Sequence, residues 1–143
     1  MTEDERRNIE ADCRSLLYRH AQLSDQGRVS EAVALFTPDG TWIRGGRHYT
    51  GHEAMMNSSG RPANAISRHY TANPVIDVVD ADNANGVTYY IVYRHDGGDQ
   101  SPVMPMPLGT AFSAGEWHDR YVRTDQGWRF AFREVKRMFQ KLD

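Results

Sequence analysis

The segment that decides the fold is GEWHDRYVRTDQGWRFAFREV, Gly115–Val135. Aromatic and polar residues alternate along it on both sides of Asp125-Gln126-Gly127, which has the composition of a turn. This pattern is typical of two antiparallel strands joined by a hairpin. We expect the first strand to extend over Leu108–Thr124 and the second over Trp128–Phe139, so the C-terminal part of the chain is predicted to be β-sheet.

Two further strands are predicted upstream of this hairpin. Val87–His95 is β-branched and aromatic throughout, and Ser67–Val79 is extended, with Pro74 indicating an edge, a bulge or a bend. The polar residues Asp80–Gly86 between them are expected to form a hairpin loop. The segment Asp96–Pro107 contains two adjacent glycines and three prolines, and we expect it to be flexible.

The N-terminal part of the chain is predicted to be mainly helical. Apolar residues recur three and four positions apart within Asp4–Ser24, which indicates an amphipathic helix. Helices followed by a meander of strands indicate an α+β fold, in which a curved antiparallel sheet wraps around the long N-terminal helix. We expect one domain over residues 1–143. The shorter elements expected are a helix at Val29–Phe36, strands at Thr41–Ile43 and Arg47–Thr50, and a helix at Gly51–Ser58.

The composition excludes several classes of protein. The chain of 143 residues has 19 acidic and 17 basic side chains, and without a basic cluster we expect no nucleic-acid binding. No apolar run approaches the roughly 20 residues that cross a bilayer. The N-terminus lacks the apolar stretch of a secretion signal, so we predict a cytoplasmic protein. Leu, Ile, Val and Phe total only 26 residues whereas Phe, Tyr and Trp total 15, which predicts an aromatic core or cavity.

Strand periodicity predicts a pocket with aromatic and ionisable side chains in its wall. With a period of two, one face of each long strand carries both kinds of residue, which is usual for a small-molecule site. The predicted faces are His69, Thr71, Asn73 and Val75; Val87, Tyr89, Ile91, Tyr93 and His95; and Trp117, Asp119, Tyr121 and Arg123. The basic residues near the C-terminus are instead predicted to form a solvated face: Arg129, Arg133, Lys136, Arg137 and Lys141.

An aspartate near a histidine is the minimal acid–base pair, and Asp25 and His69 are the candidates. The carboxylate would orient the imidazole and fix its tautomer, so that the ring could remove a proton near neutral pH. These residues are far apart in the sequence, so only the fold can bring them together. The alternative is structural, with Asp25 capping the helix end and His69 a core histidine.

A metal site is a weaker hypothesis. His48 and His52 have the spacing of a helical metal pair, but Gly51 and Tyr49-Thr50 argue against a helix there. Further ligands would have to come from His20, His69, His95 or His118. We predict no metal and no cofactor. Cys13 lies on the apolar stripe of the first helix, which favours a small core residue over a nucleophile.

Four segments resemble the SnoaL-like branch of the nuclear-transport-factor-2-like superfamily. They are LFTPDGTW (Leu35–Trp42), YTGHEA (Tyr49–Ala54), SRHYTANPVIDV (Ser67–Val78) and the hairpin quoted above. The resemblance implies a single SnoaL-like domain, a cone-shaped, cystatin-like α+β barrel with a deep pocket. Scytalone dehydratase and hexachlorocyclohexane dehydrochlorinase belong to this superfamily. In them an Asp–His pair, matching Asp25 and His69, removes a proton while water or chloride leaves.

The resulting hypothesis is a cofactor-independent lyase (dehydratase or other elimination) or isomerase that acts on a small hydrophobic cyclic or aromatic substrate. His69 would be the base and Asp25 its orienting partner. Two alternatives stay open: a non-catalytic small subunit of an aromatic-ring hydroxylating dioxygenase, and a hydrophobic-ligand-binding protein. We expect a homodimer or homotrimer formed on the sheet. The predicted substrate-binding residues are His20, Trp42, Tyr89, Tyr93, Trp117, Tyr121 and Arg123.

Overall fold

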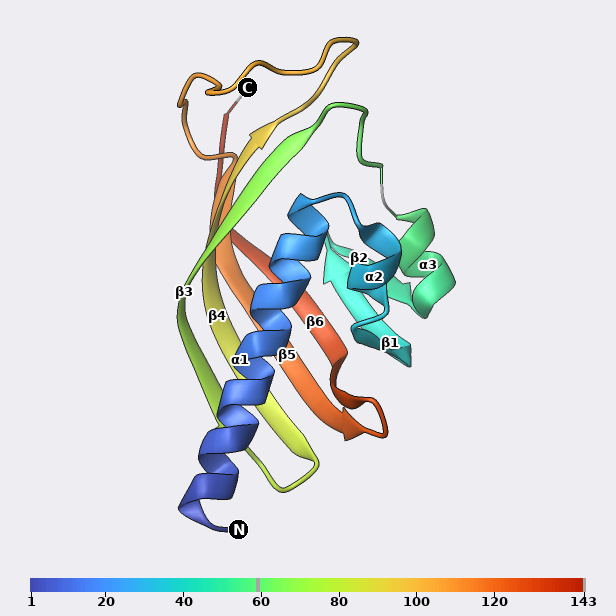
Figure 1. Cartoon of the computed structure of the whole chain (residues 1–143), viewed down its shortest axis with the longest axis vertical. Coiled ribbons are helices and arrows are strands. Elements are labelled where there is room, and N and C mark those ends of the chain that lie inside the picture. Colours follow the sequence, from blue (N-terminus) through green and yellow to red (C-terminus); the bar gives the residue numbers. More distant parts are fainter. Residues whose placement is uncertain (59, 143) are drawn as a thin grey trace.

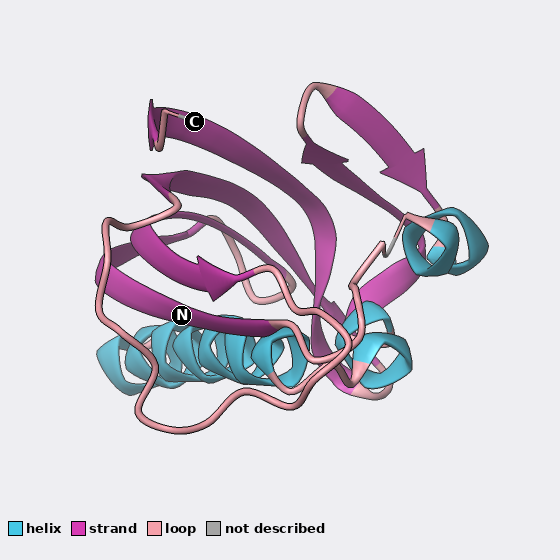
Figure 2. Cartoon of the chain, turned by 90° about the horizontal axis from the view of Figure 1, so that it is seen from above, coloured by secondary structure: helices cyan, strands magenta, loops and turns pink. Residues whose placement is uncertain are grey.

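A long helix lies across the concave side of a curved sheet in the computed structural model, which describes residues 1–58 and 60–142 (Figures 1 and 2). The predicted α+β class, with its long N-terminal helix and curved sheet, is confirmed. The elements in chain order are α1 (Glu3–Asp25), α2 (Val29–Val33), β1 (Phe36–Arg44), β2 (Arg47–Thr50), α3 (His52–Asn57), β3 (Ile66–Val78), β4 (Asn83–His95), β5 (Ser113–Thr124) and β6 (Gly127–Gln140).

Helix α1 begins at a capping box and ends at Asp25. The Thr2 hydroxyl accepts a hydrogen bond from the Glu5 amide, and the Glu5 carboxylate accepts one from the Thr2 amide. The apolar stripe predicted from the sequence is the buried face of the helix, from Ile9 to Ala21. Asp25 is the last helical residue, and Gly27, with φ of 71°, carries the chain away in a left-handed conformation.

The six strands form one open sheet in the order β2-β1-β6-β5-β4-β3. Neighbouring strands are antiparallel except for β1 and β6, which pair in parallel. The prediction of a wholly antiparallel sheet is therefore wrong at this one pair. Alternation along a strand indicates which side chains share a face, but it does not indicate which distant strands become neighbours. The sheet curves without closing, so β2 and β3 remain its edges (Figure 2).

A bulge in β3 changes which residues face the helix. The pairing of β3 with β4 shifts register between Ala72 and Val75, and Asn73 has a φ of 52°. Because a bulge adds one residue to one strand only, the side-chain alternation is reversed beyond it. Val75, predicted on the same face as His69, is therefore 59% exposed, while Ile76 is buried. The bulge lies at Pro74, where the sequence indicated an irregularity.

The predicted inner face of β4 is wrong. Tyr90 and Val92 are buried, whereas Tyr89 is 50% exposed and Tyr93 also lies on the outer face. Which residues of β4 face inward follows from the pairing of β4 with β3. Val92 lies opposite His69, and directly opposed residues of antiparallel strands share a face. Both faces of this strand carry β-branched or aromatic residues, so the composition did not distinguish them.

Several element boundaries differ from the prediction. Strand β1 begins at Phe36, within the helix expected at Val29–Phe36, and β4 begins at Asn83, which shortens the expected hairpin loop. Strand β5 begins at Ser113, and residues 96–112 form an irregular connection before it (Figure 1). Among the described residues, no helix has both the length and the apolarity needed to cross a membrane.

Candidate functional site

A cavity of about 590 Å³ lies between α1 and the sheet. Its wall includes His20 from α1, Trp42 from β1, His69 from β3, Tyr90 from β4 and Trp117 from β5. Concave sites of this size, with aromatic walls and a few convergent polar groups, are the usual form of small-molecule sites. The predicted pocket is therefore present, at the end of α1 where the chain turns towards β1.

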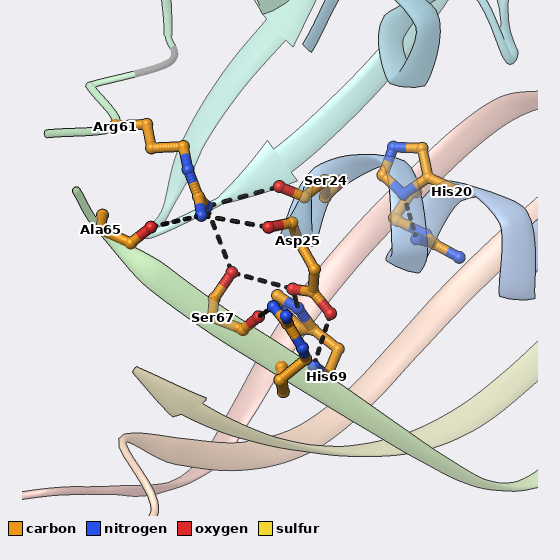
Figure 3. Close-up of polar contacts among 9 residues, drawn as sticks. His20, Ser24, Asp25, Arg61, Ala65, Ser67 and His69 are labelled. Atoms are coloured by element: carbon orange, nitrogen blue, oxygen red, sulfur yellow. Dashed lines mark hydrogen bonds and ion pairs between the residues drawn. The ribbon is translucent and has the colours of Figure 1, made fainter. Parts of the chain in front are cut away.

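Asp25 and His69 meet at this cavity. The His69 Nδ1–H donates to Asp25 Oδ1 at 2.6 Å, and the His69 backbone amide donates to Asp25 Oδ2 at 2.8 Å (Figure 3). The Ser67 hydroxyl donates to Asp25 Oδ1, also at 2.8 Å. The carboxylate thus accepts three hydrogen bonds from one strand, and these fix the position of the end of α1 against β3.

Arg61 supports this arrangement from outside the pair. Its guanidinium donates to the backbone oxygens of Ser24, Asp25 and Ala65 and to the Ser67 hydroxyl (Figure 3). Two of these acceptors are carbonyls of the last turn of α1, which have no partner within the helix. Arg61 therefore stabilises the helix end and holds the Ser67 hydroxyl that contacts Asp25. Neither Arg61 nor Ser67 was among the site residues predicted from the sequence.

The surroundings of Asp25 favour the ionised carboxylate. Burial raises the pKa of Asp25, but the hydrogen bonds from His69 and Ser67 outweigh burial and hold the pKa below its usual value. An ionised Asp25 accepts a hydrogen bond from the Nδ1–H of His69. In the neutral imidazole the single proton is therefore on Nδ1, and Nε2 is unprotonated. The His69 side chain is 25% exposed in the cavity wall, with its ring 5.9 Å from that of Trp117.

The lowered pKa of Asp25 predicts a pH dependence of stability. An unfolded aspartate titrates near pH ~3.9, so the stabilisation by Asp25 is present above that pH and is lost as the pH falls through the lower folded-state pKa. In urea denaturation at pH 6 and pH 3, the wild type should lose more free energy of unfolding than Asp25→Asn does. Equal losses in the two proteins would contradict the assigned hydrogen bonds.

His20 presents a second imidazole to the cavity. Arg133 Nη1 lies 3.2 Å from His20 Nδ1, and because a guanidinium can only donate, Nδ1 is the acceptor and Nε2 carries the proton. This Nε2–H is buried and has no partner among the described residues. Burial and the charge of Arg133 hold the pKa of His20 well below its ordinary value, so the ring is a neutral donor.

Arg133 is held by a buried ion pair. Its Nε and Nη2 donate to the two oxygens of Asp119 at 2.7 and 2.8 Å, and Tyr121 donates to the same carboxylate at 3.0 Å. Burial lowers the pKa of Arg133, but Asp119 outweighs burial and raises it. The prediction that Arg133 belongs to a solvated face is wrong. Phe130 pairs with Tyr121 and Phe132 with Arg120, so Ala131 is an extra residue in β6 that turns Arg133 inward.

Some predicted binding residues do not reach the cavity. His20, Trp42 and Trp117 line it, whereas Tyr89 and Tyr93 face outward on β4. Tyr121 is fully buried beneath the cavity wall, where it contacts Asp119. Arg123 lies at the far end of β5, bonded to the Ala81 carbonyl and stacked on Trp128. The outer face of β3 and β4 carries exposed side chains. The homodimer or homotrimer expected to form on the sheet stays a prediction.

The histidines proposed as metal ligands have other positions. His52 Nε2 bonds to the Phe36 carbonyl at 2.9 Å, and His118 pairs with Glu116 on the outer face of β5. Within residues 1–58 and 60–142, no group of three or more His, Cys, Asp or Glu side chains is arranged to hold a metal ion. Cys13 is buried in the core, and burial raises the pKa of its thiol to about 12, so it is not poised as a nucleophile.

Fold and site together define a class: α+β barrel-like domains in which the first helix and a curved sheet enclose a cavity with an Asp–His pair. Residues 5–134 match the SnoaL-like domain, and the chain belongs to this family. The resemblance found in the sequence is thereby confirmed. A search of curated protein sequences gave no match.

Solved structures share the fold at low sequence identity. A provisionally assigned scytalone dehydratase from Novosphingobium aromaticivorans has a TM-score of 0.78 and 18% identity, over 98% of this chain and 91% of that one. The hexachlorocyclohexane dehydrochlorinase LinA-type3 from Novosphingobium barchaimii has a TM-score of 0.75 and 18% identity, over 98% and 93%. An NTF2-like protein with a cystatin-like fold, from Novosphingobium aromaticivorans, has a TM-score of 0.69 and 19% identity, over 90% and 80%.

Proposed function

We propose that the protein is a cofactor-independent lyase or isomerase in which His69 is the general base and Asp25 orients it. The observation that carries this proposal is the 2.6 Å contact between His69 Nδ1 and Asp25 Oδ1 in the wall of the cavity. It leaves Nε2 as the basic atom of the ring. A positioned base of this kind typically contributes about 10²–10⁴-fold to a proton transfer.

The proposed reaction begins with a proton on a carbon next to an electron-withdrawing group. His69 Nε2 takes the proton, and the electron pair of the broken C–H bond forms a carbon–carbon double bond. In an elimination the leaving group departs with its own bonding pair, as chloride or, with the proton that the His69 imidazolium returns to it, as water. In an isomerisation the imidazolium returns the proton to another carbon. Asp25 stays ionised and stabilises the imidazolium.

His20 is proposed to assist on the opposite side of the substrate. Its neutral Nε2–H lies in a buried environment without a partner, so it can donate to an oxygen or halogen that gains negative charge. Trp42, whose ring centroid lies 5.2 Å from that of His20, would pack against the substrate ring. Tyr89, Tyr93, Tyr121 and Arg123 have no part in this proposal, because they lie away from the cavity.

A pure ligand-binding protein is the competing function. Such a protein has no need for a carboxylate that accepts three hydrogen bonds and holds one imidazole tautomer at the cavity wall. Burying a carboxylate costs free energy unless its hydrogen bonds are made. The hydrogen bonds thus explain why Asp25 can be buried, and it is the fixed imidazole tautomer in the cavity wall that supports catalysis over simple binding. The dioxygenase small-subunit alternative stays a prediction.

The test is a panel of small cyclic compounds incubated with the protein. It should contain hexachlorocyclohexane, followed by chloride release, and cyclic β-hydroxyketones, followed by ultraviolet absorbance of the enone. The reactions run in D₂O, so that isomerisation is seen as deuterium incorporation by mass spectrometry. We expect turnover of at least one class, and its loss in His69→Ala. Turnover that survives in His69→Ala would contradict the proposal.

A further inference from the structure

The cavity has an unusual charge for a site that takes a purely hydrophobic substrate. Six arginines line it, and no aspartate or glutamate among the described residues does. Asp25 lies behind His69 and is not part of the wall. The six are Arg44, Arg47, Arg61, Arg94, Arg133 and Arg137.

Three of these arginines have partners within the protein. Arg133 is paired with Asp119, and Arg61 donates to the four oxygen atoms described above. Arg94 pairs with Asp96 at 2.6 Å, with its guanidinium 4.0 Å from the centre of the Phe112 ring. Carboxylates thus balance the charges of Arg133 and Arg94, and the donors of Arg61 are used on neutral oxygens of the chain.

Arg44 has no carboxylate partner, and its donors reach a single residue, Ser58. Its guanidinium lies 4.4 Å from the Trp42 ring and 6.0 Å from the Tyr49 ring, and Nη2 donates to the Ser58 carbonyl at 3.0 Å and to the Ser58 hydroxyl at 3.3 Å. Over residues 1–58 and 60–142, no carboxylate forms an ion pair with it. The two rings hold the guanidinium plane in place, while its remaining N–H groups stay free to donate.

Arg137 adds a second charge to the wall of the same cavity as Arg44. The Arg137 guanidinium donates a hydrogen bond to the side-chain oxygen of Gln140 at 3.1 Å. Burial lowers the pKa of Arg44, and the charge of Arg137 lowers it further, so the two guanidinium groups repel each other across this part of the wall. An anion between them would remove the repulsion and would accept the free N–H donors of Arg44.

Uncharged polar groups in the same wall also lack partners. Trp42 Nε1, the Tyr90 hydroxyl and His20 Nε2 are buried, and each has no hydrogen bond among the described residues. Two of the three can act only as donors in this structure. Buried polar groups in proteins are nearly always hydrogen-bonded, so these groups offer unused donors to a ligand with acceptor atoms. Thr88 and Trp128, which do not line the cavity, also have unpartnered polar atoms, so this observation only supports the argument from the arginines.

We propose that the cavity binds a cyclic ligand that carries a carboxylate, with the carboxylate held by Arg44 and Arg137 and the ring directed towards His69. As a statement about the substrate, this rests on the function proposed above; as a statement about binding, it stands on the cavity alone. A planar carboxylate matches the two parallel N–H donors of a guanidinium, which gives both attraction and orientation.

The experiment compares two probes of the same shape by isothermal titration calorimetry. The probes are 2-naphthoate, which is an anion, and 2-naphthamide, which is its neutral counterpart. We expect 2-naphthoate to bind at least tenfold more tightly. Arg44→Gln and Arg137→Gln should each weaken 2-naphthoate about tenfold and change 2-naphthamide little, because each removes one charge. The matched control is Arg120→Gln, which removes an exposed arginine from β5.

Every outcome decides the proposal. Equal affinity for the two probes, no binding of either, or 2-naphthoate affinity unchanged in both variants would overturn it. Because Arg44 packs on Trp42, its variant could lose structure; Arg137 is exposed, so Arg137→Gln tests the charge without that risk. If 2-naphthoate binds as expected but no compound of the panel is turned over, the proposed anion site is supported and only the lyase proposal is rejected.

Discussion

Replacing His69 with glutamine is expected to lower turnover by about 10²–10⁴-fold, which is the usual contribution of a general base. Glutamine keeps a polar side chain at the cavity wall, and the backbone amide of residue 69 can still donate to Asp25. The folded structure should therefore persist while the basic Nε2 is lost. The measurement is kcat and KM on the compound that the panel identifies, with a loss in kcat and little change in KM.

Asp25→Asn should lower turnover by a comparable factor for a different reason. An amide at this position presents an NH₂ group, which favours the His69 tautomer with Nδ1 as acceptor and the proton on Nε2. The ring would then be correctly placed, but Nε2, the atom that must take the proton, would already carry one. Asp25→Asn should also unfold at lower urea concentration, because the carboxylate accepts three hydrogen bonds between α1 and β3.

His118→Ala is the matched control for these variants. His118 also pairs with a carboxylate, Glu116, at 3.1 Å, but on the outer face of β5 away from the cavity. Its removal should leave kcat within about twofold of the wild type. Should His69→Gln retain wild-type kcat, or should His118→Ala reduce turnover as strongly, His69 is not the base.

The largest expected effect on stability comes from Asp119→Ala. This change leaves the guanidinium of Arg133 buried without its carboxylate, and breaking a buried pair in this way costs about 3–5 kcal/mol. For a domain of this length the loss corresponds to a fall in melting temperature on the order of 10 °C. Thermal denaturation followed by circular dichroism measures it.

Two further variants separate the effect of leaving a buried charge unpaired from the effect of losing an ion pair. In Asp119→Leu combined with Arg133→Met both charges are absent, so the double variant should recover most of the stability lost by Asp119→Ala. Asp96→Ala removes a carboxylate from the exposed pair with Arg94, and it should cost less than about 1 kcal/mol. If Asp119→Ala were no more destabilising than Asp96→Ala, the account of Arg133 as a core residue would be wrong.

The parts of the fold that local sequence signals control could be predicted. Helix α1 has an apolar stripe with the helical period and a capping residue before it, so its extent was predicted to within about one residue at each end. The Asp25–His69 contact could be proposed because an aspartate near a histidine is the minimal acid–base pair and because the family resemblance implied this pair. The sequence did not show that Ser67 and Arg61 complete the site, since their contacts depend on how the chain returns after α3.

The errors about which side chains of β3, β4 and β6 face inward share one physical origin, the phase of alternation along a strand. Bulges at Asn73 in β3 and Ala131 in β6 each add a residue that reverses the pattern. The second bulge turns Arg133 into the core, although its neighbours in sequence indicate a solvated surface. In β4, where both faces carry large side chains, the phase is set by pairing with β3 and not by composition. Tyr90 was missed and Tyr89 favoured for this reason.

The position of Asp25 at the end of α1 makes the length of that helix a functional quantity. Each residue of an α-helix advances it by about 1.5 Å and rotates it by roughly 100°. One residue inserted between the buried stripe and Asp25 would therefore turn the carboxylate away from β3, even with every site residue unchanged in identity. The register between the helix and the strand is thus as strict a requirement for the proposed chemistry as the aspartate and the histidine themselves.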